Sequence, residues 1–333
     1  MAPAGVKRGE QFIEELWYGR HPLSLLLAPL GWLFALAVRL RRLAWRSGLL
    51  SPRRLPVPVI VVGNISVGGT GKTPLVIWLC KRLREAGHRP GVVIRGYRGL
   101  GRHWPQQARP DSDPRVVGDE AVVLARRTGC PIAVGPDRVA AGEALLEYHD
   151  CDLIVSDDGL QHYRLARDVE IAVVDGIRRH GNRRCLPAGP LREPVSRLRE
   201  VDLVVSNGVA GRGEFPMKYV PGDLVSLIEP QARRPLERFR GQPVHAVAAI
   251  GMPERFFSLL VHHGLRVEKH PFPDHHVFTP QELDFGDDLP VLMTEKDAVK
   301  CLPFARPDWW YLPIEADLPE TFLHRLKLLL KEK

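Results

Sequence analysis

The chain has 333 residues, of which 44% are hydrophobic and 26% are charged, so it can form two domains or one large one around a real core. This composition excludes a disordered protein and a fibre. The formal net charge of +8 indicates an anionic partner, which can be a nucleic acid, an anionic lipid or a phosphorylated substrate. The five cysteines lie far apart without a C-x-x-C pair, which predicts reduced thiols of a cytosolic protein and neither a disulfide framework nor a zinc site.

An uncharged segment of seventeen residues runs from Pro22 to Val38. Six arginines follow it with no acidic residue among them: Arg39, Arg41, Arg42, Arg46, Arg53 and Arg54. A secretory signal peptide is a poor explanation, because Glu10, Glu14 and Glu15 stand before the segment, where a signal peptide carries positive charge.

The same segment is short for a membrane span. Seventeen helical residues extend over about 25 Å, whereas the hydrocarbon core is about 30 Å thick. Pro29 and Gly31 are expected to break the helix further. We therefore predict that residues 1–55 form a membrane-associating segment whose helix lies in the interface, with its arginines on anionic headgroups. The alternative is a helix buried against the core, and the density of arginines favours the membrane.

Apolar runs alternate with amphipathic segments from Val57 onward. The apolar runs predict strands at 57–63, 91–95, 131–134, 152–156, 170–175 and 202–207, and the amphipathic segments predict helices at 72–86, 119–128 and 137–149. Continuous β-branched runs between helices are typical of a parallel sheet that is covered on both faces. The first two hundred residues therefore predict an open α/β sheet.

The pattern changes between Gly211 and Gly241, where Gly, Pro and Arg become frequent and no helical period appears. We predict a linker here, with extended pieces around 217–220 and 224–228. The α/β pattern then resumes, with strands at 244–251 and 291–294 and helices at 253–263 and 318–330. The predicted limits are 56–214 for the first domain, 215–241 for the linker and 242–333 for a smaller second domain, with a cleft between the domains.

The strongest motif follows the first predicted strand and opens the next helix. It comprises Ser66, Val67, Gly68, Gly69, Thr70, Gly71, Lys72 and Thr73. This context is the one that a phosphate-binding P-loop requires, since backbone amides and the helix N-terminus face the phosphates, Lys72 can reach the β- and γ-phosphates, and Thr73 can bind Mg²⁺. Ser66 stands where the general motif has glycine, so the alternative is a chance glycine-rich turn. Because ATP is cytosolic, the motif also argues against secretion.

Two acids, Asp157 and Asp158, end the predicted strand at 152–156. A carboxylate at the carboxyl end of a strand beside a P-loop is typical of an Mg²⁺-ATP site. Adjacent residues of a strand point apart, so we predict that Asp157 holds Mg²⁺ through water and that Asp158 turns into the next loop. Asp158 stays a candidate metal residue beside Thr73 and Asp157, because the sequence leaves open which acid holds Mg²⁺ directly. The alternative is an acidic turn without a ligand.

The residues from Val59 to Pro74, with Asn64 and the serine variant of the P-loop, resemble the signature of the lipid A 4′-kinases (tetraacyldisaccharide 4′-kinases). Further segments match that family in order: Arg95–Tyr97, Gly118–Glu120, Gly135–Arg138, Asp157–His162, Gly189–Glu193, Phe272–His276 and Thr294–Asp297. The resemblance implies a P-loop α/β/α core joined by a short β-linker to a smaller α/β domain. It also implies transfer of phosphate from ATP with Mg²⁺ to the 4′-hydroxyl of tetraacyldisaccharide 1-phosphate, giving lipid IVA, at the cytoplasmic face of the bacterial inner membrane.

The resemblance implies that Asp119 is the catalytic base, paired with His275, and that Lys72 assists catalysis. The residues alone favour a helix N-cap for Asp119, and from them His275 could lie in an exposed turn. The resemblance further implies contacts with the substrate or its phosphate for Tyr97, Glu120, Arg138, Arg192, Glu193 and Asn207. Two of these residues have a simpler explanation. Arg138 could lie on a solvated helix face, and Asn207 could be an ordinary turn residue.

The loop from Arg178 to Arg184 is basic, and it suits either the substrate phosphate and lipid surface or plain solvent. No nucleic-acid module is recognisable, and the resemblance implies no obligate protein partner. One alternative function is a partner-regulated ATPase at the membrane, but Val67 replaces the signature lysine of that class. The other is a non-catalytic membrane scaffold, against which Lys72, Thr73 and Asp157 argue.

Overall fold

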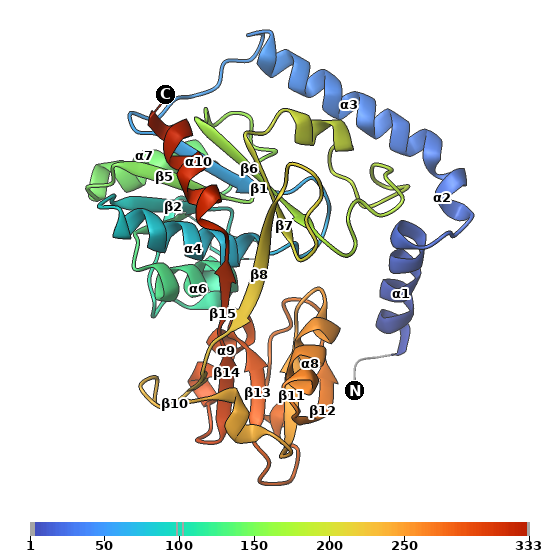
Figure 1. Cartoon of the computed structure of the whole chain (residues 1–333), viewed down its shortest axis with the longest axis vertical. Coiled ribbons are helices and arrows are strands. Elements are labelled where there is room, and N and C mark those ends of the chain that lie inside the picture. The colour runs from blue at the N-terminus through green and yellow to red at the C-terminus, as the bar shows by residue number, and fades with distance from the viewer. Residues whose placement is uncertain (1–3, 98, 102, 332–333) are drawn as a thin grey trace.

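The computed structural model of the chain describes residues 4–97, 99–101 and 103–331 (Figure 1). Within these residues the strands form one sheet of nine strands and one of six. The nine-stranded sheet has the order β15 (Ile314–Asp317), β8 (Phe215–Pro221), β7 (Leu203–Asn207), β6 (Val169–Asp175), β1 (Val59–Gly63), β5 (Leu153–Asp157), β2 (Pro90–Ile94), β4 (Ile132–Val134), β3 (Gln106–Ala108). The six-stranded sheet has the order β10 (Arg233–Arg234), β9 (Leu224–Ser226), β14 (Trp309–Leu312), β13 (Val291–Thr294), β11 (Pro243–Ala248), β12 (Arg266–Pro271).

The helices fall into three groups along the chain (Figure 1). The N-terminal group is α1 (Ala4–Tyr18), α2 (Leu23–Leu26) and α3 (Ala28–Arg46). The helices between the strands of the larger sheet are α4 (Lys72–Glu85), α5 (Pro114–Val117), α6 (Asp119–Thr128) and α7 (Arg138–Tyr148). The C-terminal group is α8 (Pro253–His262), α9 (Glu295–Cys301) and α10 (Glu320–Lys331).

The central strands of the nine-stranded sheet run parallel, as the continuous apolar runs predict. Both of its faces are covered. Ile60 and Val62 pack into a core with α4, α6 and α10, whereas Val59 and Val61 pack with α7 on the other face. The edges differ from the prediction, because β3 pairs antiparallel with β4, and β15 pairs antiparallel with β8. The sheet is therefore mixed, with a parallel centre.

The predicted linker, residues 215–241, takes part in both sheets. β8 pairs in parallel with β7 in the larger sheet, and β9 and β10 belong to the smaller one. The chain later returns, because β14 pairs antiparallel with β9 and β15 pairs antiparallel with β8. The helix after β15 then packs Phe322 and Leu326 into the core of the larger sheet. The four domain limits stay a prediction, and the last of them, 242–333, groups β15 and α10 with the smaller sheet although they pack on the larger one.

The N-terminal helices lie along one side of the molecule, with α3 on its outer rim (Figure 1). The segment is interrupted just before Pro29, as predicted, because α2 ends at Leu26 and α3 begins at Ala28. The expected break at Gly31 is wrong, because α3 continues through it to Arg46. Pro29 stands in the first turn, where its missing N–H has no helical acceptor to lose. Gly31 lets α3 pack closely against the backbone at Cys185, since an added Cβ would lie 2.9 Å from the Cys185 carbonyl oxygen.

The outer face of α2 and α3 is apolar. Leu26 is 75% exposed and Trp32 is 69% exposed, so this face is not covered by the protein. The opposite face of α3, with Ala28 and Gly31, is buried against the core, as the alternative expects. Four of the six arginines bind acids of the chain itself: Arg42 and Arg46 pair with Glu200, Arg53 with Glu143 and Arg54 with Asp168. None of the helices within the described ranges is both long enough and apolar enough for a membrane crossing.

Candidate active site

The phosphate loop lies between β1 and α4, at the edge where the parallel strands of the larger sheet end. Gly68 and Gly71 have φ of +105° and +100°, which favour glycine. A Cβ added to Gly68 or Gly69 would meet nothing within 4 Å, so this part of the loop faces open space. The first half of the loop is fixed, because the Val67 amide donates to the Pro190 carbonyl at 2.8 Å.

The base of the loop is held by neighbouring strands. Ser66 is buried and forms a β-bridge. At the end of β7, Asn207 Nδ2 donates to the Thr70 carbonyl at 3.3 Å. A Cβ at Gly71 would lie 2.4 Å from the Tyr219 hydroxyl, so only glycine fits there. Asn207, predicted to bind substrate, therefore lies against the phosphate loop, which it positions.

The two acids after β5 face different neighbours. Asp158 has φ +48°, and its carboxylate lies 3.5 Å from Lys72 Nζ and 3.0 Å from the Arg192 guanidinium. Burial would raise the pKa of Asp158, but Lys72 and Arg192 lower it to about 2. Asp158 thus remains ionised and holds the P-loop lysine and Arg192 together at the mouth of the loop.

Asp157 is 1% exposed, and its Oδ1 has no hydrogen-bond partner among the described residues. Burial, together with the nearby Glu120 carboxylate, raises the pKa of Asp157 to about 7. A nearby cation would strongly stabilise the ionised form of such a buried, unpartnered carboxylate. Thr73, buried in the first turn of α4, supplies a second oxygen, so the pair fits Mg²⁺, a hard cation that prefers oxygen ligands.

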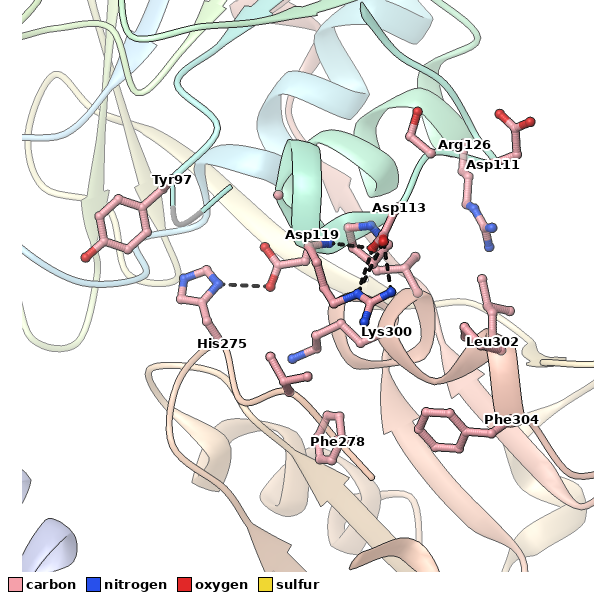
Figure 2. Close-up of a pocket in the computed structure, with 17 residues that line it drawn as sticks. Tyr97, Asp111, Asp113, Asp119, Arg126, His275, Phe278, Lys300, Leu302 and Phe304 are labelled. Atoms are coloured by element: carbon pink, nitrogen blue, oxygen red, sulfur yellow. Dashed lines mark hydrogen bonds and ion pairs between the residues drawn. The ribbon is translucent and has the colours of Figure 1, made fainter. Parts of the chain in front are cut away.

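Asp119, at the start of α6, meets His275, which lies in the loop after β12 (Figure 2). His275 Nδ1 donates to Asp119 Oδ2 at 2.9 Å, across 156 positions of sequence. Asp119 is the first residue of α6, and Gly118 is the N-cap, so the capping alternative is wrong. His275 adopts φ +62°, an uncommon conformation for a residue with a side chain, as is frequent at functional sites.

The charges around this pair favour an ionised carboxylate. Burial would raise the pKa of Asp119, but the hydrogen bond from His275 and the charge of Lys296 lower it to about 2. The same hydrogen bond raises the pKa of His275. At neutral pH Asp119 is therefore a fixed anion that can accept a proton, and the imidazole beside it stabilises the charge.

Further ion pairs join the two sheets near this point. Lys296 of α9 pairs with Glu120 of α6, and Arg255 of α8 lies 2.6 Å from Asp175 at the end of β6. The sequence predicted Glu120 as a substrate ligand, whereas its carboxylate is engaged by Lys296. Lys296 was missed as a site residue, although the segment Thr294–Asp297 belongs to the resemblance that pointed to Asp119.

A cavity of about 470 Å³ opens beside the Asp119–His275 pair (Figure 2). Its wall near α9 is apolar and includes Phe278, Leu302 and Phe304. Charged side chains, among them those of Lys300, Arg115 and Arg126, line the rest of it. The cavity therefore combines an apolar surface with cations next to a carboxylate that can accept a proton.

One protein-family model matches residues 23–331 of the chain, that of Tetraacyldisaccharide-1-P 4′-kinase. The chain belongs to this family. The tetraacyldisaccharide 4′-kinase of Nitrosococcus oceani is 57% identical over 316 residues, which are 95% of this chain and 93% of that protein. That of Methylobacillus flagellatus is 52% identical over 329 residues, 97% of this chain and 98% of that protein.

A solved structure has the same fold. It is the crystal structure of LpxK from Aquifex aeolicus in complex with ATP, which is 26% identical, has a TM-score of 0.77 and covers 92% of this chain and 99% of that one. Membership of the tetraacyldisaccharide 4′-kinase family confirms the predicted phosphotransferase and its place in lipid A biosynthesis. The roles of individual residues stay predictions.

In this tetraacyldisaccharide 4′-kinase, Tyr97 and Arg138 lie at the same sheet edge. The Tyr97 ring is exposed, and its centroid is 5.6 Å from that of His275. Arg138 is buried at the start of α7, which lowers its pKa to about 10, and it donates to the Asp158 carbonyl at 3.4 Å. The alternative that Arg138 lies on a solvated helix face is therefore wrong.

Glu193 lies elsewhere. It is fully buried, accepts a hydrogen bond from the Tyr163 hydroxyl at 2.5 Å and forms an ion pair with Arg197 at 3.1 Å. Its carboxylate is thus engaged inside the kinase, and the predicted contact with substrate finds no support in this position.

The basic loop that begins at Arg178 is partly paired. Arg178 binds Glu14 of α1, and Arg179 lies 2.6 Å from Glu214. These two arginines fasten the loop to α1 and to the segment before β8, so they contribute to the fold of the kinase whichever of the two readings of the loop holds.

Proposed function

We propose that the chain transfers the γ-phosphoryl group of ATP to the 4′-hydroxyl of tetraacyldisaccharide 1-phosphate, giving lipid IVA, and that Asp119 is the base. The observation that carries this proposal is the Asp119–His275 hydrogen bond of 2.9 Å between the two sheets. A sugar hydroxyl is a weak nucleophile at neutral pH, and a carboxylate held next to it orients it and takes its proton.

In the proposed reaction the 4′-oxygen attacks the γ-phosphorus, the bond to the β–γ bridging oxygen breaks, and the hydroxyl proton passes to Asp119. Because the pKa of Asp119 lies at about 2, the carboxylate is free of a proton before the reaction. His275 holds the carboxylate in place and spreads the charge, as imidazoles do in other acid–imidazole pairs. Lys72 neutralises charge that develops on the transferred phosphate.

Asp157 and Thr73 are the residues that we propose for Mg²⁺, with Asp158 holding Lys72 beside them. The bound ion would supply charge neutralisation between the β- and γ-phosphates. Support comes from the buried, unpartnered Oδ1 of Asp157 and from a pKa of about 7, which a bound cation would lower. In this proposal Asp157 would hold the Mg²⁺ that accompanies the ATP phosphates. Gly68 and Gly69 leave open space in the loop for these phosphates.

The decisive experiment uses the full chain in detergent with ATP, Mg²⁺ and tetraacyldisaccharide 1-phosphate, and mass spectrometry of the lipid. The wild type should add one phosphate to the lipid. Asp119→Asn should lower kcat by about 10²- to 10⁴-fold, the usual contribution of a general base, while ATP binding is unchanged. Asp111→Asn is the matched control, because Asp111 lines the same cavity but no contact joins it to His275. Near-normal turnover of Asp119→Asn would exclude Asp119 as the base.

We further propose that α2 and α3 lie in the cytoplasmic leaflet of the inner membrane. The exposed leucines and Trp32 support this, rather than the arginines, most of which bind acids of the chain. A triple variant with Leu26, Trp32 and Leu33 changed to Gln should bind anionic vesicles at least about tenfold more weakly, since each loses apolar burial. The control is Leu100→Gln, an equally exposed leucine away from these helices. Equal binding of the triple variant and the control would contradict the proposal.

A further inference from the structure

A second cluster of ligand-forming side chains lies in the six-stranded sheet, away from the phosphate loop. It consists of His245 on β11 and of Glu268 and His270 on β12. One possible ligand atom from each residue lies within 4.8 Å of the others. The two imidazoles are closest, with His245 Nδ1 2.9 Å from His270 Nε2, and the Glu268 carboxylate lies 3.6 Å from His245 Nδ1.

Sheet geometry explains why these side chains converge. β11 and β12 are parallel neighbours, and His245 is directly opposite Glu268. His270 is two positions further along β12, so it points to the same face as Glu268. All three side chains therefore project from one face of the sheet, and their meeting point is fixed by backbone pairing instead of by a flexible loop.

An outer carboxylate orients the first imidazole. His245 is 2% exposed, and its Nε2 lies 3.1 Å from Asp287 Oδ1. Donation of the Nε2 proton to Asp287 leaves the Nδ1 lone pair facing His270. This is the arrangement of a metal-binding histidine, whose second ring nitrogen donates to a carboxylate that fixes the tautomer.

The surroundings of the two rings suit a metal site as well. Phe285 packs on both imidazoles, with centroids 4.1 Å from each, and forms an apolar cover. Glu268 is exposed and opens the site to solvent.

We propose that His245, His270 and Glu268 form a binding site for a divalent transition metal, with Zn²⁺ as the best match. Two imidazoles and one carboxylate are a common zinc ligand set, and water completes the tetrahedron. Mg²⁺ disfavours this set because it prefers oxygen ligands. Zinc–nitrogen bonds of about 2.0–2.1 Å place tetrahedral ligand atoms roughly 3.3 Å apart, a small widening of the present 2.9 Å between the rings. The ion replaces the proton that the two rings share.

The site has a structural consequence for the kinase. β12 ends at Pro271, and the chain reaches His275 four residues later. A metal ion between β11 and β12 would tie down the strand that leads to the histidine of the candidate active site. It would act by stabilising the smaller sheet, without contact with the substrate.

The test uses the full chain without a polyhistidine tag, treated with chelator and then titrated with Zn²⁺ in a calorimeter in the presence of Mg²⁺. One Zn²⁺ per chain should bind, and the melting temperature should rise with it, because a ligand that binds the folded chain stabilises it. Co²⁺ should give the visible absorption of a tetrahedral site, which reports the ligand geometry independently of activity.

Three variants and one control assign the ligands. Glu268→Gln and His270→Gln should each weaken Zn²⁺ binding more than about tenfold, and Asp287→Asn should weaken it by about 10- to 100-fold through the lost outer carboxylate. Because Glu268 is exposed, its variant is expected to fold even if the others melt early. The control replaces His262 and His263, an adjacent pair outside the cluster, by Gln and should bind as the wild type does. No saturable Zn²⁺ binding, or binding that disappears in the control, would overturn the proposal.

Discussion

Asp157 offers a direct test of how the protein balances charge at the nucleotide site. Its pKa is raised from 3.8 to about 7, mainly by burial. The folded chain therefore keeps a proton that the unfolded chain loses between about pH 4 and pH 7, and stability falls as the pH rises through this window. At 1.36 kcal/mol for each pKa unit, the full effect above pH 7 is about 4 kcal/mol.

Asp157→Asn removes this penalty, because an amide has the shape of the protonated acid and never ionises. In chelator and without nucleotide, the variant should melt above the wild type at pH 8, by roughly 8–16 °C on the usual scale of 2–4 °C per kcal/mol. At pH 5, where the wild-type carboxyl is already protonated, the two melting temperatures should converge. The measurement is a thermal melt followed by circular dichroism at both pH values.

The adjacent acid supplies the control with the opposite sign. The pKa of Asp158 is lowered to about 2, so its contribution to stability is present above about pH 4 and is lost only as the pH falls below that. Asp158→Asn should therefore melt below the wild type at both pH 5 and pH 8. If Asp157→Asn melts below the wild type at pH 8, or shifts equally at both pH values, Asp157 is not a destabilised buried acid.

Three further changes probe the site and the core. His275→Asn should lower kcat by about 10- to 100-fold and shift the acid limb of the pH–rate profile upward, because the pKa of its carboxylate partner rises without the hydrogen bond. Gly71→Ala should weaken ATP binding more than about tenfold in equilibrium dialysis, since the methyl group would meet the Tyr219 hydroxyl and φ is +100°. Arg197→Met should destabilise the fold by about 3 kcal/mol in urea, because the buried Glu193 and the partly buried Glu170 each lose an ion pair. Arg82→Met, at an exposed pair, should change the free energy of unfolding by less than about 1 kcal/mol.

The sequence predicts the parallel centre of the larger sheet because each buried strand is a continuous apolar run, as in Val59–Gly63. It does not predict β12, whose residues Arg266–Pro271 are mostly polar, because an edge strand buries only part of its surface. It does not predict β15 either, because nothing local in Ile314–Asp317 shows that the partner strand lies about a hundred residues earlier. Pro29 marks the interruption between α2 and α3, because a proline is favoured in the first turn of a helix. Gly31 does not interrupt α3, and it allows the helix to lie close to Cys185.

The sequence predicts some parts of the candidate site and not others, as it does for the fold. The phosphate loop and the acids after β5 are readable because a strand, a turn and a helix lie next to each other in sequence. The meeting of Asp119 with His275 depends on how two sheets face each other, so only the resemblance pointed to it. The substrate contact of Glu193 stays a prediction of the resemblance. The sequence does not show that its carboxylate is held in the interior by Tyr163 and Arg197, because these contacts depend on the fold.

The two passages of the chain between the sheets run side by side. β8 and β15 pair at one end, β9 and β14 pair at the other, and the Gly222 amide donates to the Pro313 carbonyl at 2.9 Å between them. The connection between the two sheets is therefore a double-stranded ribbon that backbone hydrogen bonds hold together. Any motion that separates His275 from Asp119 must bend both strands of this connection together. The connection therefore restricts how the smaller sheet, with His275, can move relative to the larger sheet, with the phosphate loop.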